Sequence, residues 1–438
     1  MRKGPVLVMS ALCLLHLGCT EIAAIPTTAG IGPNPQLPEP KNSLIPTVNI
    51  ATAIGWPANT SPVGSMGTVV TEFARDLDHP RWLYVLPNGD VLVAETNSPP
   101  KPDDVGGIRG FFMGLVMKKA GAKTDSANRI TLLRDTDGDG KADYRSVFIS
   151  GLYSPFGMAL VENTLYVANS DAIVKFAYAT GDTQIDAPLT KVVELPAGTI
   201  NHHWTKNIIA SKDGKKLFAS IGSNSNIAER GMAAEQDRAS IWEIDLATSR
   251  HRIYANGLRN PVGMAWGEND NTLFTVVNER DELGNDLVPD YLTSVKDGGF
   301  YGWPYSYFGK NLDKRVQPQQ PAMVASAISP DYALGAHTAS LGLASARGNT
   351  LPSEFANGMF IGQHGSWNRK PHSGYKVIFI PFVDGKPSGL PKDVLTGFLS
   401  ADGQAYGRPV GVAQGKNGNL LVADDVGNKV WSVSSIKK

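Results

Sequence analysis

Short apolar runs separated by small polar turns recur along the chain, and they follow one pattern. Each copy starts with a polar residue, usually followed by proline and a small-residue turn, and leads to an apolar run that ends in Val-Ala or its equivalent. The copies cover residues 79–94, 154–168, 203–220, 260–276, 340–362 and 408–423. Each copy predicts a pair of short strands joined by a turn such as Pro87-Asn88-Gly89-Asp90.

Copies spaced by several tens of residues are typical of four-stranded blades arranged around one axis. We therefore predict an all-β fold, a six-bladed β-propeller of antiparallel blades, for residues 66–438. The blades of a propeller share one axis, so this length is expected to form a single domain.

The first residues have the pattern of an export signal. Positive charge at Arg2 and Lys3 precedes an apolar run, residues 6–17, that is too short to span a bilayer. We predict a signal peptide over residues 1–18. Gly18-Cys19 resembles a bacterial lipoprotein box, which predicts a periplasmic protein anchored in the membrane through a lipidated Cys19. Ordinary cleavage nearby is the alternative.

The next segment, residues 19–65, is rich in Pro, Thr, Ala, Asn and Gly, a composition that predicts a flexible tether. The only other cysteine, Cys13, lies in the signal peptide, so we expect no disulfide in the mature protein. Stability must then come from packing.

The overall charge excludes one class of partner. The chain has 41 basic and 41 acidic residues and no Lys/Arg run longer than a pair. Such a balance gives no positive field to attract nucleic acid. We expect no nucleic-acid partner, and contact with a membrane only through the N-terminal anchor.

Residues at the start of each copy should meet around the axis, because the inner strand of every blade lines the central channel. These positions, together with the loop after the fifth copy, are rich in cations and imidazoles. They are Arg81, His203, Arg259, Asn260, His337, His364, Arg369, Lys370 and Arg408. A neutral protein that gathers cations at one point suits a polyanionic ligand, and arginine forks suit planar carboxylates best.

The histidine pattern favours proton transfer over a zinc site. His202 and His203 are adjacent, so on an extended strand only one of them can reach the channel. No His-Glu-x-x-His helix and no Gly-x-Ser-x-Gly elbow occurs in the sequence. A single imidazole suited to general-base work near neutral pH remains.

Two acidic stretches point to calcium. The first has alternate carboxylates around a glycine turn, an arrangement that wraps a hard cation, and we predict a structural calcium there. Its candidate ligands are Asp135, Asp137, Asp139 and Asp143. The second stretch follows the fourth inner hairpin on the channel side, where we predict a calcium ion at the active site. Its candidate ligands are Asp281, Glu282, Asp286 and Asp290.

Two motifs carry a resemblance to a known family. Residues 257–261, Gly-Leu-Arg-Asn-Pro, followed by residues 298–304, Gly-Gly-Phe-Tyr-Gly-Trp-Pro, closely resemble the soluble glucose and sorbosone dehydrogenases that use pyrroloquinoline quinone. Residues 201–203, 364–369 and 407–409 fall in the same order along the chain as in that family. The likeness runs from about residue 78 to residue 433, nearly all of the predicted propeller.

The resemblance implies a cofactor and roles for several residues. In that family a tricarboxylate quinone lies over the mouth of a six-bladed propeller with calcium, and a histidine removes the hydroxyl proton of a sugar. His203 corresponds to that catalytic histidine. Arg259 and Asn260 correspond to the cofactor clamp, Arg408 to the late arginine, and Arg369 or Lys370 to the family lysine region.

One departure moves the likeness toward the sorbosone and aldose branch. Glucose-type members have a Gly-Pro pair in the calcium loop, where this chain has Arg280-Asp281-Glu282. We therefore expect a dehydrogenase that uses pyrroloquinoline quinone and calcium and oxidises an aldose, a sugar aldehyde or a related sugar alcohol. No haem-attachment motif occurs, so its electrons would pass to a soluble carrier or a membrane quinone.

Two other functions remain open from the sequence. One is a calcium-dependent propeller lactonase or esterase, which needs an axial calcium but no arginine cluster. The other is a surface propeller that binds glycans or a partner protein without turnover. Sugar specificity depends on loops, and the composition of these loops does not determine their conformation.

Overall fold

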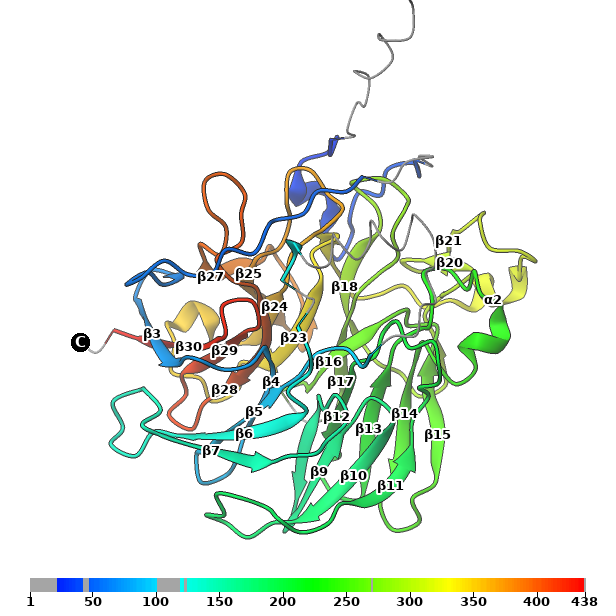
Figure 1. Cartoon of the computed structure of the whole chain (residues 1–438). Coiled ribbons are helices and arrows are strands. Elements are labelled where there is room, and N and C mark those ends of the chain that lie inside the picture. The colour runs from blue at the N-terminus through cyan, green and yellow to red at the C-terminus, as the bar shows by residue number, and fades with distance from the viewer. Residues whose placement is uncertain (1–21, 42–46, 101–118, 122–123, 269–270, 437–438) are drawn as a thin grey trace, which may run out of the picture.

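The computed structural model describes residues 22–41, 47–100, 119–121, 124–268 and 271–436. These residues form an all-β propeller with six antiparallel blades, which confirms the predicted fold (Figure 1). The predicted signal peptide and both cysteines lie outside the described residues. Among the described residues, no helix is long and apolar enough to cross a membrane.

Each of the first three blades takes its four main strands from one continuous segment, and a short strand joins the edge of blade 3. Blade 1 contains β4 (Pro80–Val85), β5 (Val91–Glu95), β6 (Arg129–Arg134) and β7 (Tyr144–Ile149). Blade 2 contains β8 (Met158–Val161), β9 (Thr164–Ala168), β10 (Ala172–Ala177) and β11 (Thr190–Glu194). Blade 3 contains β12 (Lys206–Ala210), β13 (Lys216–Ile221), β14 (Ser240–Asp245), β15 (His251–Asn256) and β19 (Gly299–Phe300).

The last three blades each take a strand from the N-terminal part of the chain. Blade 4 contains β16 (Pro261–Trp266), β17 (Leu273–Val277), β18 (Pro289–Ser294), β22 (Tyr332–Ala336) and β1 (Ile31–Gly32). Blade 5 contains β23 (Ser340–Ser345), β24 (Gly358–Gln363), β25 (Lys376–Val383), β26 (Lys386–Pro387), β27 (Lys392–Thr396) and β2 (Val63–Gly64). Blade 6 contains β28 (Pro409–Gln414), β29 (Leu420–Asp424), β30 (Lys429–Ser435) and β3 (Thr68–Ala74). Strand β3 thus closes the ring from the other end of the chain.

The remaining elements are short and lie in loops. They are the hairpin β20 (Ser306–Tyr307) and β21 (Asn311–Leu312), the helix α2 (Pro321–Ser326), and the 3-10 turns η1 (Thr27–Gly30), η2 (Met232–Glu235) and η3 (Ser353–Phe355).

The core consists of six apolar clusters, one between each pair of neighbouring blades. Successive residues of one strand therefore belong to different clusters. Leu217 packs between blades 2 and 3, whereas Phe218 packs between blades 3 and 4. Both faces of each inner strand are buried, which explains why the repeats are continuous apolar runs rather than alternating ones.

Inner strands of neighbouring blades approach closely at glycines of the repeat. A Cβ atom on Gly263 of β16 would lie 2.7 Å from the backbone of β23, and one on Gly411 would lie 2.7 Å from the backbone of β4. Glycine at this position of the inner strand is therefore a packing requirement, because there is no room for a side chain.

The described part of the N-terminal segment lies against the propeller. Strand β1 pairs with β22, strand β2 pairs with β27, and Ala51 is fully buried. This differs from the free tether that we expected for residues 19–65. The outer strands of blades 4 and 5 offer unpaired backbone groups, and a short polar segment can pair with them without adding an apolar core.

Candidate functional site

One end of the propeller gathers the residues that start each repeat. In an antiparallel hairpin, the start of the inner strand and the end of the second strand lie at the same edge. The inner strands β4, β8, β12, β16, β23 and β28 contact one another in this order, and β28 contacts β4. We call this end of the axis the mouth. It contains the residues just before each inner strand and just after each second strand (Figure 1).

A buried carboxylate, Asp425, forms the centre of the first mouth cluster. Its Oδ2 lies 2.8 Å from Arg81 Nη1, 2.9 Å from His364 Nε2 and 3.5 Å from His79 Nε2. Burial alone would raise the pKa of Asp425, but His364, His79 and Arg81 hold it well below its usual range. Burial lowers the pKa values of His364 and His79, so both imidazoles are neutral at neutral pH.

The stability of the protein should depend on pH through His79. Burial lowers the pKa of His79 from an ordinary value of about 6.5 to about 4, despite the nearby charge of Asp425. The unfolded chain therefore binds more protons between these pH values. The contribution of neutral His79 to the free energy of unfolding is therefore complete above pH 6.5. It is lost as the pH falls to 4, and the total loss is about 3 kcal/mol.

Urea unfolding of the wild type and of His79→Gln between pH 7 and pH 4 measures this effect. We expect a shallower loss of stability in His79→Gln, and the wild-type slope in His251→Gln, which changes an exposed strand position. Equal slopes in all three proteins would contradict the assignment.

A second cluster surrounds Asp281. Its carboxylate lies 2.7 Å from Asn368 Nδ2, 3.4 Å from His337 Nδ1 and 3.6 Å from Arg259 Nη2. Burial alone would raise the pKa of Asp281, but His337 and Arg259 keep it below its usual range. Although burial opposes it, the hydrogen bond and charge of Asp281 raise the pKa of His337. The predicted site residues Asp281, His337 and Arg259 thus form one charged network.

Arg259 is engaged mainly with the protein itself. Its guanidinium donates to the carbonyls of Asn226, Asn278 and Glu279 and to Asn226 Oδ1. It thereby holds the loop that carries Asp281. Arg259 therefore orders the neighbouring loop in this structure, and its role as a cofactor clamp stays a prediction.

His203 lies in the turn before β12 with its orientation fixed. Its Nδ1 is 2.7 Å from the Ser223 carbonyl oxygen, which can only accept a hydrogen bond. Nδ1 therefore carries the proton, and Nε2 keeps its lone pair. Burial and the charge of Arg259 place the pKa of His203 well below its ordinary value. A neutral imidazole with an acceptor at Nε2 is the protonation state that a general base requires.

Two neighbours shape the surroundings of His203. A Cβ atom on Gly222 would lie 2.5 Å from His203 Cβ and 2.3 Å from Asn260 Oδ1, so Gly222 lies directly against both. Lys206, fully buried in β12, donates to the carbonyls of His203 and Trp204. The sequence reasoning did not single out Lys206, although a lysine at the start of a predicted inner strand was a visible signal.

Arg408 is a buried cation without a carboxylate. Its side chain is almost inaccessible, its Nη2 donates to the Ala51 carbonyl at 3.2 Å, and its guanidinium carbon lies 5.0 Å from the centre of the Tyr375 ring. Among the residues that the structure describes, no acidic side chain pairs with it. The Nε atoms of Arg408 and Arg81 and the Oδ1 atoms of Asn260 and Asn368 are buried without a hydrogen-bond partner.

The mouth unites residues from blades that are not neighbours in the ring. Arg81 of blade 1 lies over the ring of Trp204, which follows His203 at the start of blade 3, at 5.8 Å. Burial and the charge of Arg408 lower the pKa of Arg81, although Asp425 opposes this. Arg259, Arg408 and His203 therefore lie at the same end of the propeller, as the repeat positions predict.

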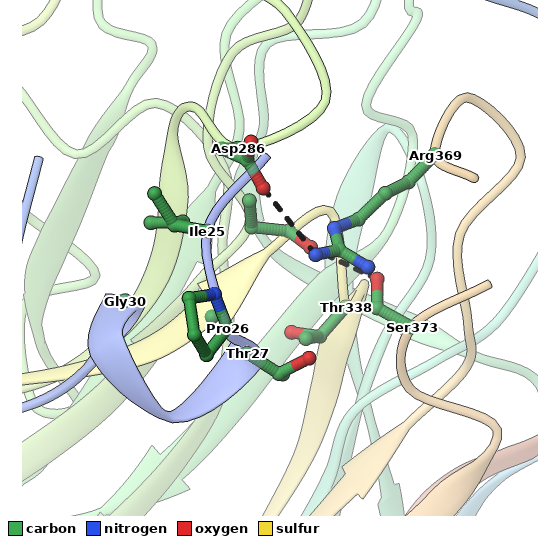
Figure 2. A pocket seen from close by; sticks show the side chains of 10 residues that line it. Ile25, Pro26, Thr27, Gly30, Asp286, Thr338, Arg369 and Ser373 are labelled. Atoms are coloured by element: carbon green, nitrogen blue, oxygen red, sulfur yellow. Dashed lines mark hydrogen bonds and ion pairs between the residues drawn. The ribbon is translucent and has the colours of Figure 1, made fainter. Parts of the chain in front are cut away.

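Two cations that we expected at the site, Arg369 and Lys370, lie in the mouth loop after β24, where their contacts are with the protein. Arg369 donates to the carbonyls of Asn285 and Pro371 and lies 3.4 Å from Asp286, as Figure 2 shows for the ion pair. Ile25 to Thr27 of the N-terminal segment border the same small pocket. Lys370 is exposed, and its backbone N–H donates to Asn285 Oδ1. These contacts fasten the loop 364–373 to the loop 278–288.

The four acidic residues proposed for an active-site calcium do not converge on one point in this structure, and calcium at the mouth stays a prediction. Asp290 accepts hydrogen bonds from the backbone N–H groups of Glu279 and Ser340, both at 2.9 Å, and burial raises its pKa to about 6. Asp286 pairs with Arg369, and Glu282 is exposed. Of the four, Asp281 belongs to the mouth cluster. In the described chain, three acidic groups come within ligand distance of one another only at Asp135, Asp137 and Asp139.

The predicted structural calcium loop connects β6 and β7 in blade 1. The ligand oxygens of Asp135, Asp137 and Asp139 lie within 4.8 Å of one another. Asp143 instead bonds the backbone N–H and the hydroxyl of Thr136. By the alternation of strand directions, this loop lies at the end of the propeller opposite the mouth. Calcium there stays a prediction, with three convergent carboxylates instead of four.

Two residues that follow second strands were not predicted. Asp425 follows β29, and Asn368 belongs to the loop after β24, between the predicted His364 and Arg369. The signal was present, because a hairpin brings these positions to the same edge as the starts of the inner strands. Asp424-Asp425 after an apolar run would have identified the central carboxylate.

The two family motifs pack against each other. Gly257 has a positive φ of 72°, and a Cβ there would lie 2.6 Å from the Phe300 ring and 2.8 Å from the Gly302 nitrogen. Trp303 Nε1 donates to the Asn226 carbonyl, whose side chain contacts Arg259. The segment 298–304 therefore supports the loop that holds Arg259, which explains why the two motifs occur together.

Gly257→Ala should reveal this contact. Left-handed backbone alone costs an alanine about 1 kcal/mol, and a clash with a packed ring adds about 2 kcal/mol. Gly151 has nearly the same φ, 71°, and nothing within 4 Å of its Cβ position, so Gly151→Ala isolates the backbone cost. In urea unfolding, the free energy of unfolding should fall by about 3 kcal/mol in Gly257→Ala and by about 1 kcal/mol in Gly151→Ala. Equal losses would show that the motif contact contributes nothing.

Comparison with known proteins gives two family matches and several relatives. Residues 70–366 match a model described as a domain of unknown function, DUF7133, and residues 312–435 match a model described as TrAA12-like. An uncharacterized protein of Borreliella burgdorferi is 30% identical over 295 residues, which span 64% of this chain and 76% of that protein. A pyrroloquinoline quinone-dependent pyranose dehydrogenase of Coprinopsis cinerea is 25% identical over 292 residues, 53% of this chain and 39% of that relative.

Solved structures share the propeller. The holo form of the pyrroloquinoline quinone domain of the Coprinopsis cinerea enzyme has a TM-score of 0.68 at 20% identity, and the match covers 88% of this chain and 100% of that one. The calcium structure of a Trichoderma reesei enzyme of carbohydrate-active family AA12 has a TM-score of 0.69 at 17% identity, with 89% and 99% covered. The quinone-bound aldose sugar dehydrogenase of Streptomyces coelicolor has a TM-score of 0.54 at 16% identity, with 85% and 99% covered. These TM-scores establish a common fold.

Proposed function

The chain belongs to the family of the domain of unknown function DUF7133. From the residues at the mouth, we propose that the protein is a dehydrogenase that uses pyrroloquinoline quinone to oxidise an aldose, a sugar aldehyde or a related sugar alcohol. The observation that carries this proposal is the buried, unpaired Arg408 beside Arg81 and opposite a neutral His203. The 25% identical pyranose dehydrogenase of Coprinopsis cinerea supports it.

The residues at the mouth fit a flat, anionic cofactor. A buried cation without a counterion is costly, and buried polar atoms in folded proteins normally have partners. The N–H groups at Nε of Arg408 and Arg81 have none in the described chain, and both suit a carboxylate. Arg408 and Arg81 would therefore hold the carboxylates, with Asn260 and Asn368 as neighbouring amides. When bound, the quinone supplies the electron sink for the oxidation.

The residues of this chain have separate tasks in that reaction. His203 takes the proton of the sugar hydroxyl at Nε2, while its Nδ1–H stays on the Ser223 carbonyl. Lys206 and Asn260 hold the turn and the flank of the imidazole. Asp425 balances Arg81 and orients His364 from the opposite side of the mouth. This division gives the neutral base to His203 and the anion-binding guanidinium groups to Arg81 and Arg408.

Calcium is a further part of the proposal, supported by the calcium structure of the Trichoderma reesei relative. The carboxylates at the mouth do not form a calcium site built by the protein alone, because Asp286 and Asp290 are engaged elsewhere. We therefore assign no step of the reaction to calcium. Its role is a question for titration, with and without a chelator.

Export and anchoring through Cys19 also remain proposals, as does the acceptor, a soluble carrier or a membrane quinone. The motivating observation is the N-terminal pattern of charge, apolar run and Gly18-Cys19. Mass spectrometry of the protein expressed in a bacterium with its own N-terminus would show either an acylated Cys19 or an unmodified terminus. The second result would reject the anchor.

Reconstitution tests the proposed activity. Purified protein is mixed with pyrroloquinoline quinone, with or without calcium, and reduction of an artificial electron acceptor is followed across a panel of aldoses, sugar aldehydes and polyols. We expect quinone-dependent reduction with at least one class. Hydrolysis of lactones or esters without acceptor reduction would favour the hydrolase alternative, and quinone or glycan binding without any turnover would favour the binding propeller.

A further inference from the structure

A short N-terminal stretch, residues 47–57, lies beside Arg408, and we call it the strap. The Ala51 carbonyl accepts the hydrogen bond from Arg408 Nη2, and Ala51 itself is fully buried. The guanidinium of Arg408 also lies over the Tyr375 ring, with 5.0 Å between its carbon and the ring centre. A segment more than 350 positions away in the sequence thus contacts the unpaired cation of the mouth.

A second link joins the strap to the backbone of Arg408 through Asp424. Trp56 Nε1 donates to Asp424 Oδ2 at 2.6 Å, and the other oxygen of Asp424 accepts from the backbone N–H of Arg408 at 2.8 Å. Asp424 is fully buried and also accepts from Trp431. Trp56 therefore acts on the main chain of Arg408 through one carboxylate.

The strap is fastened on both sides of Arg408. On one side, Asn49 forms a bridge with Asn368 and donates from Nδ2 to the Arg369 carbonyl at 2.8 Å. On the other side, the backbone of residues 52–54 exchanges two hydrogen bonds of 2.8 Å with Ala405. The ring of Trp56 packs against Phe398, Tyr406 and Trp431, with ring centres 5.2 to 5.5 Å apart.

We propose that the strap positions Arg408 for the anionic cofactor, with Trp56 as the positioning residue. The inference rests on the proposed function, because it names the device that orients the cofactor-binding cation. A guanidinium without a carboxylate has no partner of its own to fix its direction. The Ala51 carbonyl and the Asp424 link supply that direction before the ligand binds, and preorganisation of this kind raises affinity.

The experiment compares Trp56→Phe with Ile54→Ala in the full chain. Trp56→Phe keeps an aromatic ring but removes the Nε1–H group that bonds Asp424. Ile54→Ala changes a half-exposed side chain of the same strap and keeps its backbone bonds. Fluorescence titration with pyrroloquinoline quinone should show a dissociation constant raised about tenfold by Trp56→Phe, the effect of about 1.4 kcal/mol, and unchanged by Ile54→Ala.

A second arm uses no cofactor. Urea unfolding of the wild type, Trp56→Phe, Arg408→Met and the double variant gives a double-mutant cycle. If the strap and Arg408 are coupled, the shift of the unfolding midpoint in the double variant differs from the sum of the single shifts. A merely structural tryptophan would lower the midpoint by an additive amount and leave the dissociation constant as in the wild type.

The two arms separate the two proposals. Absence of quinone binding by the wild type would overturn the proposed function, while a non-additive cycle would still support the coupling between strap and Arg408. An additive cycle together with a wild-type dissociation constant in Trp56→Phe would overturn the positioning role and leave the proposed function intact.

Discussion

His203→Asn is expected to reduce kcat by a factor of about 10² to 10⁴, the range that a general base contributes. Asparagine keeps an N–H group near the Nδ1 position, where it can still donate to the Ser223 carbonyl, but it lacks the acceptor at Nε2. The loss should appear in kcat with little change in cofactor affinity, because the imidazole does not hold the cofactor. Steady-state kinetics of the reconstituted protein measure both quantities.

The pH profile gives an independent check on the same residue. Burial and Arg259 keep the pKa of His203 well below 6.5, so the base stays deprotonated through neutral pH. Activity should therefore begin to fall only below pH 6.5. His202→Asn, at the adjacent position, should stay within a few-fold of the wild type. If His364→Asn abolished turnover and His203→Asn did not, the base would be the imidazole on Asp425 instead.

Arg408→Met is expected to weaken binding of pyrroloquinoline quinone at least about 100-fold while leaving the cofactor-free protein as stable as the wild type, or more stable. The affinity falls because a buried charge-assisted pair is lost, an effect of about 3 kcal/mol or more. Stability does not fall because the cation is buried without a carboxylate, so its removal relieves a desolvation cost. Quinone titration and urea unfolding measure the two effects.

A buried arginine that is paired provides the matched stability control. Arg280 is fully buried and pairs with Glu279 at 3.0 Å and Asp313 at 3.1 Å. Arg280→Met leaves Glu279 without its cation and Asp313 with Arg315 alone, and it should cost about 3 to 5 kcal/mol. A similar loss in Arg408→Met would mean that Arg408 contributes to the fold, and unchanged quinone affinity would remove it from the cofactor site.

The propeller was predictable because its information is local and repeated. Each copy of the repeat predicts one inner hairpin. In the structure the six copies form the hairpins β4–β5, β8–β9, β12–β13, β16–β17, β23–β24 and β28–β29. The outer strands vary more, since they need only pair with a neighbour. The fate of residues 47–65 was not predictable, because Pro-rich composition does not distinguish a free segment from one that pairs with an exposed strand edge.

The candidate site was predictable only in part. Positions at the start of each copy identified Arg81, His203 and Arg408, because equivalent positions of a repeat meet at the axis. The acidic residues of the loop 278–290 looked alike in the sequence. The fold separates them: it directs Asp281 to His337, and encloses Asp290 among backbone N–H groups. Such differences depend on neighbours from other blades.

The sequence by itself determined the number of blades, the strands that line the axis and the end at which cations gather. The reason is that each copy of the repeat contains both an apolar run and the polar residues that precede it. Only the tertiary structure decided which cations have partners. Asp425 neutralises Arg81, Asp281 faces Arg259, and Arg408 is left to the strap. An ion pair or hydrogen bond forms only when two side chains approach within a few ångströms, and here the two can be hundreds of positions apart in the sequence. No local sequence pattern determines such distances.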